Sequence, residues 1–397
     1  MPERRRAWIW GAGIVGVAVM ATAGFFLSRP GPLGFRGNIR GSSLVIDESS
    51  PLPVLHQALR ESDPRALAVF QHRLATAQEE AKAALSDADA EQWIETLGCL
   101  RTGYLKFSPP ARATAAVVAC RILERFTPEP APANWLAALG PVHDILSASM
   151  ADGDSNVRFI ALGELARFWV WMPGRSLTPV EEDALGRWKE SLHRPVIRCL
   201  ASSDVRTRIG AIACLGSLPI DSACVAALPY LDDPQSVDVR RQTLVSFAQR
   251  PSLMTEEMLL KRLHDVDPSI RDTAAAVLKA RGLTQEQISL GGLLVSPNPA
   301  QRASVIALIK DRTDIDPIVW LLQLSHDPDE TVRLEAVEAL AHKTSSVSIR
   351  RRLAELATSD RSAAVRQAAG RFIPSAEETT ASLPPLPGSS ILNPKAN

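Results

Sequence analysis

An arginine recurs at a nearly constant interval through most of this chain. Four of its copies follow one another at steps of 31 residues, and steps of 33, 32 and 50 residues add three more. In chain order the seven are Arg158, Arg208, Arg240, Arg271, Arg302, Arg333 and Arg366. A period of this length is typical of small supersecondary units that must stack on their neighbours, because one unit cannot bury its own apolar face.

Each arginine lies near the start of an apolar helical pattern. The residues six and four positions before it are mostly Asp, Ser or Asn, whose side chains cap the first turn of a helix. The residues three, four and seven positions after it are apolar in nearly every copy, as Ala336, Val337 and Leu340 are after Arg333. This spacing forms one stripe along a helix. A second apolar helix, such as 317–323, precedes the arginine, so each repeat is predicted to be a helix pair.

The repeat resembles the HEAT-like repeats, in the short form first named for phycobilisome lyases, with the pattern Asp-x-x-x-x-Val-Arg-x-x-Ala. The resemblance covers residues 140–373 and implies an all-α fold, an α-solenoid of stacked antiparallel helix pairs. It also implies a polar ladder between successive repeats. The acids and arginines of this ladder are Asp152 and Arg158, Asp265 and Arg271, Asp327 and Arg333, and Asp360 and Arg366. Such families include scaffolds, lyases and a few metal or nucleic-acid enzymes, so the resemblance implies a fold more than a function.

The N-terminus carries three arginines and then 21 uncharged residues, 7–27. A helix of that length matches a hydrocarbon core of about 30 Å, so we predict a single transmembrane helix. The arginines favour a cytoplasmic N-terminus, residues 1–6, with the solenoid on the outer, periplasmic or extracytoplasmic side. A cleaved signal peptide is the alternative, because Ala21-Thr22-Ala23 resembles a cleavage site. Ala12 and Gly16 would allow weak self-association of the helix.

The same segment contains Gly11, Gly13 and Gly16 in the spacing of a dinucleotide-binding fingerprint. That fingerprint works only between a strand and a helix, with an acidic residue on a second strand about 20 residues later. Neither strand is predicted here, so we expect no cofactor.

The remaining segments have simple compositions. Residues 28–53 are rich in Gly, Pro and Ser and are predicted to be a flexible linker. Residues 54–139 read as an N-terminal helical cap with degenerate, off-register repeats. The repeats of 140–373 are interrupted by an insertion near 169–190, and 374–397 is predicted to be a disordered tail.

Composition and motifs argue against several functions. The chain has 44 basic and 44 acidic residues. The helix positions predicted to face away from the core are neutral or acidic, among them Glu335 and Glu338, so we expect no nucleic-acid partner. No nucleophile, phosphate-loop or zinc motif occurs, and no His-Glu pair follows the repeat arginine as it does in metal-binding HEAT enzymes. We therefore expect no catalytic residue and no metal.

The five cysteines lie in apolar runs and read as core residues. One bridge, Cys199 to Cys214 or Cys214 to Cys224, is an option if the domain is exported.

The insertion concentrates aromatic side chains, namely Phe168, Trp169, Trp171 and Trp188. Aromatic anchors dominate protein interfaces, so these four are the candidate partner-binding residues. The alternative is that they fill a wider gap between two repeats. We therefore expect a membrane-tethered, non-catalytic scaffold or adaptor that binds a protein or peptide. A lyase-type enzyme or enzyme subunit acting on a bound tetrapyrrole or protein is the alternative.

The anchor prediction can be tested by fractionation. We expect the full-length chain to sediment with membranes and to resist carbonate extraction, because residues 7–27 lie in the bilayer. A shortened chain that begins at Ser42 should stay in the supernatant. A mature protein whose first residue is Gly24 would show that the segment is a cleaved signal peptide instead.

Overall fold

The computed structural model describes residues 46–80, 85–126, 132–171, 177–218, 220–310, 312, 316–342 and 346–372, without the side chains of 77–80, 170 and 171. Every regular element in these ranges is a helix and none is a strand, which confirms the predicted all-α class. The predicted transmembrane helix, most of the linker and the predicted tail lie outside them. Within them, no helix has both the length and the apolar character needed to cross a bilayer.

The chain divides into two compact units. The first takes the described residues through Thr255 and also Asp267–Ala274. The second takes Glu256–Val266 and everything from Ala275 onward, so α13 (Pro268–Ala280) contributes to both units.

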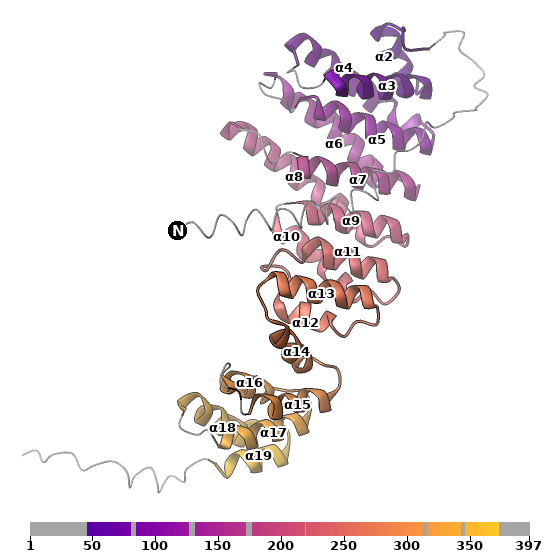
Figure 1. Cartoon of the computed structure of the whole chain (residues 1–397). Coiled ribbons are helices and arrows are strands. Elements are labelled where there is room, and N and C mark those ends of the chain that lie inside the picture. The colour runs from indigo at the N-terminus through magenta and orange to yellow at the C-terminus, as the bar shows by residue number, and fades with distance from the viewer. Residues whose placement is uncertain are drawn as a thin grey trace, which may run out of the picture. The chain divides into compact units, whose positions relative to one another are not determined.

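The first unit consists of two layers of helices (Figure 1). One layer contains α3, α5, α7, α9 and α11, each in contact with the next, and the other contains α2, α4, α6 and α8 in the same way. The bounds are α2 (Leu52–Arg60), α3 (Pro64–Glu80), α4 (Asp87–Gly103), α5 (Pro109–Glu124), α6 (Leu139–Met150), α7 (Ser155–Trp171), α8 (Pro179–Leu200), α9 (Val205–Ser217), α10 (Asp221–Cys224) and α11 (Val237–Phe247). Three 3-10 helices, η1 (Tyr104–Lys106), η2 (Trp135–Ala138) and η3 (Val225–Asp232), lie between them.

The second unit repeats this arrangement. Its arginine-bearing helices α15, α17 and α19 contact one another in turn, while α12 contacts α14 and α16 contacts α18 in the other layer. The bounds are α12 (Glu256–Arg262), α14 (Gln285–Leu294), α15 (Pro299–Ile309), α16 (Pro317–Leu324), α17 (Glu330–Ala341), α18 (Val347–Ser359) and α19 (Ala363–Gly370). One apolar core runs through α15 to α19.

The residue types at equivalent positions of the repeats explain why these segments are helices and which face of each helix is buried. Ala336, Val337 and Leu340, at the three apolar positions after Arg333, are fully buried. The residue four positions before the arginine caps the helix, and its side chain accepts a hydrogen bond from a backbone N–H of the first turn. The capping residues of this kind are Asp204, Ser236, Asn298, Asp329 and Ser362.

The repeat pattern also extends further towards the N-terminus than predicted. Arg112 lies in the first turn of α5, and Ala115, Ala116 and Ala119 occupy the same three buried positions after it. Helix α5 contacts α7 in the layer of arginine-bearing helices. The segment taken as an off-register cap therefore contains an in-register copy.

The insertion lengthens helices as well as a connection. Helix α7 has 17 residues and α8 has 22, whereas α11 and α15 have 11 each. Thr178 begins α8 with a capping box, in which its side chain accepts from the N–H of Glu181 and the Glu181 carboxylate accepts from the N–H of Thr178.

Helices α2 and α4 approach each other closely at Gly103. A Cβ atom there would overlap the carbonyl oxygen of Leu59, and the Ser62 hydroxyl donates to the Gly103 carbonyl at 2.8 Å. Gly98, in the same helix, has no neighbouring atom within 4 Å of its missing Cβ.

These two glycines form a matched pair for a stability test. We expect Gly103→Ala to lower the free energy of unfolding by about 1–3 kcal/mol, because the added methyl group forces α2 and α4 apart. Gly98→Ala should leave it unchanged or raise it by up to about 1 kcal/mol, since alanine is the better helix former. Thermal melts of both variants measure the difference. Equal melting temperatures would show that α2 and α4 do not meet at Gly103.

Candidate functional site

The repeat arginines share one hydrogen-bonding geometry, and Arg302 shows it in full. Its Nη1 donates to the carbonyl oxygens of Ser296 at 2.8 Å and Pro297 at 3.3 Å, in the turn before its own helix. Its Nε and Nη2 donate to the two carboxylate oxygens of Asp327, in the next repeat, at 2.7 and 2.8 Å. Both side chains are buried. One guanidinium therefore closes its own turn and forms a bidentate, charge-assisted bond to the neighbouring repeat.

Arg333 repeats this arrangement one unit later. Its Nη1 donates to the carbonyls of Asp327 and Pro328, and its Nε and Nη2 each lie 3.0 Å from a carboxylate oxygen of Asp360. Burial alone would raise the pKa of Asp360, but hydrogen bonds from Arg333 and from the Ser362 N–H outweigh it and hold that pKa below its usual value. The carboxylate is therefore charged at neutral pH and fully paired.

The acid and the arginine of one repeat thus do not pair through their side chains. The arginine binds the backbone carbonyl of the acid in its own repeat and the carboxylate of the acid in the next. Arg366 makes the first of these contacts, with Nη1 2.6 Å from the Asp360 carbonyl. Asp265 and Arg271 are half-buried and belong to different units.

The first unit contains one strong and one weakened version of the same bond. Arg112 binds Asp152 through Nε at 2.6 Å and Nη2 at 3.0 Å. Arg208 Nη1 donates to the carbonyls of the turn before its own helix, as in the other copies. Its acidic partner in the next repeat is Asp233, one residue before the position that the acid takes in the other repeats. Arg208 Nη2 and Asp233 Oδ2 are 3.7 Å apart, and in the part of the chain that the structure describes the buried Nε of Arg208 has no hydrogen-bond partner.

At Arg158 the ladder is interrupted. Its Nη1 donates to the carbonyls of Asp152 at 2.6 Å and Gly153 at 3.1 Å, as in the other copies. The residue in the acid column of the next repeat is Ser202, which has no charge and whose hydroxyl accepts from the Asp204 N–H at 3.2 Å. The Nε of Arg158 is buried and has no hydrogen-bond partner among the described residues. An unsatisfied buried donor of this kind costs about 1–3 kcal/mol.

A hollow of about 400 Å³ adjoins this arginine. Its charged lining residues are Arg158, Arg198 and Asp152, and its hydroxyls come from Ser202 and Ser203. Because the Asp152 carboxylate is already bound by Arg112, the two arginines leave the lining with a net positive charge. The hollow therefore has the chemistry to accept an anionic group.

Three of the four aromatic residues predicted to bind a partner are buried, which argues against that hypothesis for these three. Phe168, Trp169 and Trp188 are 1%, 4% and 7% exposed. Their ring centroids lie 5.3–5.7 Å apart, all with edge-to-face packing, and Trp188 Nε1 donates to the Leu139 carbonyl at 2.9 Å. The alternative, that they fill the space between two long helices, fits these contacts. The Trp171 side chain lies outside the description.

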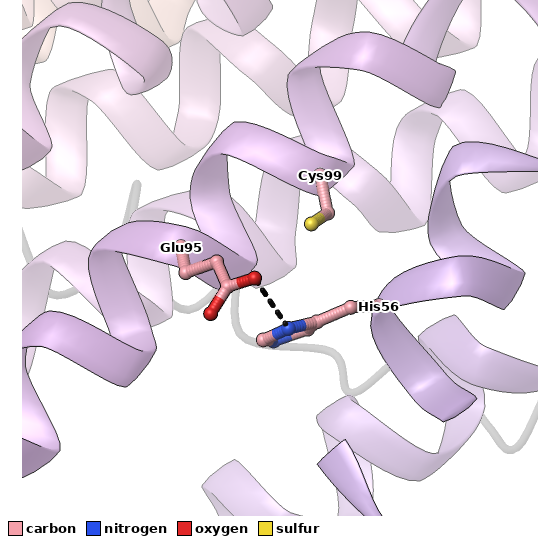
Figure 2. A group of neighbouring side chains, drawn as sticks. All are labelled: His56, Glu95 and Cys99. Carbon is pink, nitrogen blue, oxygen red and sulfur yellow. Dashed lines mark ion pairs between the residues drawn. The ribbon is translucent and has the colours of Figure 1, made fainter. Parts of the chain in front are cut away.

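A second cluster of polar side chains lies between α2 and α4. His56, Glu95 and Cys99 each place one potential ligand atom within 4.8 Å of the others (Figure 2). The sequence analysis missed this group because His56 precedes the other two by about forty positions and belongs to no repeat column. The only sequence signal was the four-residue spacing of Glu95 and Cys99, which places both on one face of a helix.

The cysteines are all free and buried, so neither of the two bridges considered above is formed. Burial raises the pKa of Cys199, Cys214 and Cys224, which makes their thiols unreactive.

Comparison with known proteins adds no assignment: no family model and no curated protein matches this chain. The case for a function therefore rests on the residues and their geometry.

Proposed function

We propose that this chain is a membrane-tethered α-solenoid of HEAT-like repeats that binds a protein partner and performs no chemistry of its own. The N-terminal apolar segment would hold the N-terminus in the cytoplasm and the repeats on the outer side of the membrane. The observation that carries the binding proposal is the interrupted ladder at Arg158.

The other copies indicate what Arg158 would bind. In Arg112, Arg302 and Arg333, a carboxylate accepts from the Nε and Nη2 edge of the guanidinium. Arg158 has a serine and not an acid in this position of the next repeat, and it lines the hollow. A Glu or Asp side chain from another protein could therefore take the place that an aspartate takes elsewhere in the repeat. Hydrogen bonds to charged groups contribute about 1.5–3 kcal/mol each.

Two features favour a ligand from outside over an internal substitute. Asp204, the acid that caps α9, directs one carboxylate oxygen to the N–H and the hydroxyl of Thr207 at 2.8 and 2.7 Å, and among the described residues it forms no hydrogen bond with Arg158. Arg198 adds a second positive charge to the same hollow. An acidic segment of a partner would meet both arginines, so we expect the partner to present clustered Glu or Asp residues.

Ser202→Asp tests this proposal, because it restores the missing acid of the column. We expect it to raise the melting temperature of the full-length chain, since the Arg158 Nε gains an acceptor. It should also weaken binding of a glutamate-rich peptide at least 10-fold. Ser289→Asp is the control, because it adds the same charge at an exposed position that does not line the hollow. Titration calorimetry with the glutamate-rich peptide, a glutamine-rich peptide of equal length and inorganic phosphate measures the affinities.

The outcomes separate the alternatives. Binding of the glutamate-rich peptide that is lost in Ser202→Asp and kept in Ser289→Asp supports the proposal. Binding of phosphate but not of the peptide would contradict a protein partner, and a peptide affinity equal in both variants would place the contact elsewhere. A purified chain that carried a visible chromophore would favour the tetrapyrrole alternative.

A further inference from the structure

The cluster of His56, Glu95 and Cys99 is set up by the packing of two helices. Glu95 and Cys99 are four residues apart in α4, so their side chains leave the same face of that helix, and α2 brings His56 against it (Figure 2). His56 and Cys99 are buried, whereas the Glu95 side chain is 58% exposed. The group is therefore closed on the inner side and reached from solvent past Glu95.

Hydrogen bonds hold the ring of His56 in place. The Thr96 hydroxyl oxygen lies 2.8 Å from His56 Nε2 and 2.8 Å from the Gln92 carbonyl oxygen. In the tautomer in which Nε2 carries the proton, the Thr96 hydroxyl accepts from Nε2 and donates to the Gln92 carbonyl. Nδ1 of the neutral ring then holds a lone pair.

Nδ1 faces a carboxylate, because it lies 3.3 Å from Glu95 Oε1. In the tautomer with the proton on Nε2, both of these atoms are acceptors, and a cation between them is attracted by both.

The spacing suits a metal ion. Bonds of about 2.0–2.1 Å from a tetrahedral ion to a histidine nitrogen and a carboxylate oxygen place those two atoms about 3.3 Å apart. This is the distance found between His56 Nδ1 and Glu95 Oε1. The sulfur of Cys99 completes the group within 4.8 Å, so a closure of about 1 Å would bring all three to bonding distance.

We propose that His56 Nδ1, the Glu95 carboxylate and the Cys99 thiolate bind one transition-metal ion, of which Zn²⁺ fits best. Nitrogen, oxygen and sulfur donors together are typical of zinc, and the two negative ligands balance its charge at a half-buried site. Thr96 is the positioning residue, because its hydroxyl holds the ring with Nδ1 directed at the ion. The fourth position lies on the Glu95 side and is open to water. Arg60 Nη2 lies 3.5 Å from the same carboxylate oxygen, Glu95 Oε1, so its guanidinium would move aside when the ion binds. This site is independent of the hollow at Arg158.

The test uses the full-length chain, stripped with a chelator and titrated with Co²⁺ alone. We expect one Co²⁺ per chain, with the near-ultraviolet charge-transfer absorption of a thiolate ligand, and complete displacement by Zn²⁺, which binds such sites more tightly. Cys99→Ser should abolish the charge-transfer band. Glu95→Gln should weaken Zn²⁺ binding at least 10-fold, and Thr96→Val should weaken it about 10–100-fold.

Two controls keep the result interpretable. Glu91→Gln removes another exposed carboxylate one turn earlier in α4, and Cys120→Ser removes another buried thiol, so both should bind Co²⁺ like the original chain. Glu95 is exposed, so its variant tests the site without disturbing the core. Absence of stoichiometric Co²⁺ binding, a charge-transfer band that persists in Cys99→Ser, or equal Zn²⁺ affinity in Glu95→Gln and Glu91→Gln would each overturn the proposal.

Discussion

The bidentate bond between a repeat arginine and the aspartate of the next repeat sets the register of neighbouring repeats where it forms, at Arg112, Arg302 and Arg333. Arg302 and Asp327 are both buried, and neither could be left without its partner at acceptable cost. The arginine also fixes the turn before its own helix through Nη1. One side chain therefore links the local conformation of a repeat to the position of its neighbour, and a slip of one residue would break both contacts.

Most of the stabilisation of the folded repeats still comes from the apolar side chains that are buried beside the ladder. Ala336, Val337 and Leu340 bury their side chains completely, and such burial contributes about 25 cal/mol for each Å² of apolar surface removed from water. This driving force is not directional. The ion pairs add the direction, because a buried guanidinium accepts only a narrow range of partner geometries. Packing thus makes the repeats associate, and the ladder sets how they associate.

The arginine–aspartate bond is weakened in one repeat and missing in another. The aspartate that pairs with Arg208 lies one residue before the usual position, and for Arg158 that position holds a serine. A repeat that needs an acid and lacks one leaves a charged donor that another molecule can satisfy. We therefore propose that a partner binds at the interruption and not at the regular copies, whose groups are already paired.

The all-α class and the buried face of its repeat helices could be predicted from the sequence, because a repeat is recognised by its register. Helix caps such as Asp329 and core positions such as Leu340 were predictable, because the same residue types recur at equivalent positions of the repeats. Arg112 was not predicted to be a repeat arginine because no acid-rich turn precedes it, although three alanines follow it at the usual apolar positions. The role of Trp188 could not be read from sequence, because aromatic area serves a core and an interface equally well. His56, Glu95 and Cys99 meet only through the packing of α2 on α4, which no local pattern records.

A double-mutant cycle on Arg302 and Asp327 tests the central claim most directly. The free energy of unfolding would be measured for the full-length chain, for Arg302→Ala, for Asp327→Ala and for the double variant. The cycle cancels the loss of the carbonyl contacts of Arg302, so it isolates the link between neighbouring repeats. We expect a coupling energy of about 1–3 kcal/mol, with each single variant destabilised. Two effects that add to within about 0.5 kcal/mol would contradict the claim, because the repeats would then be held in register by apolar packing alone.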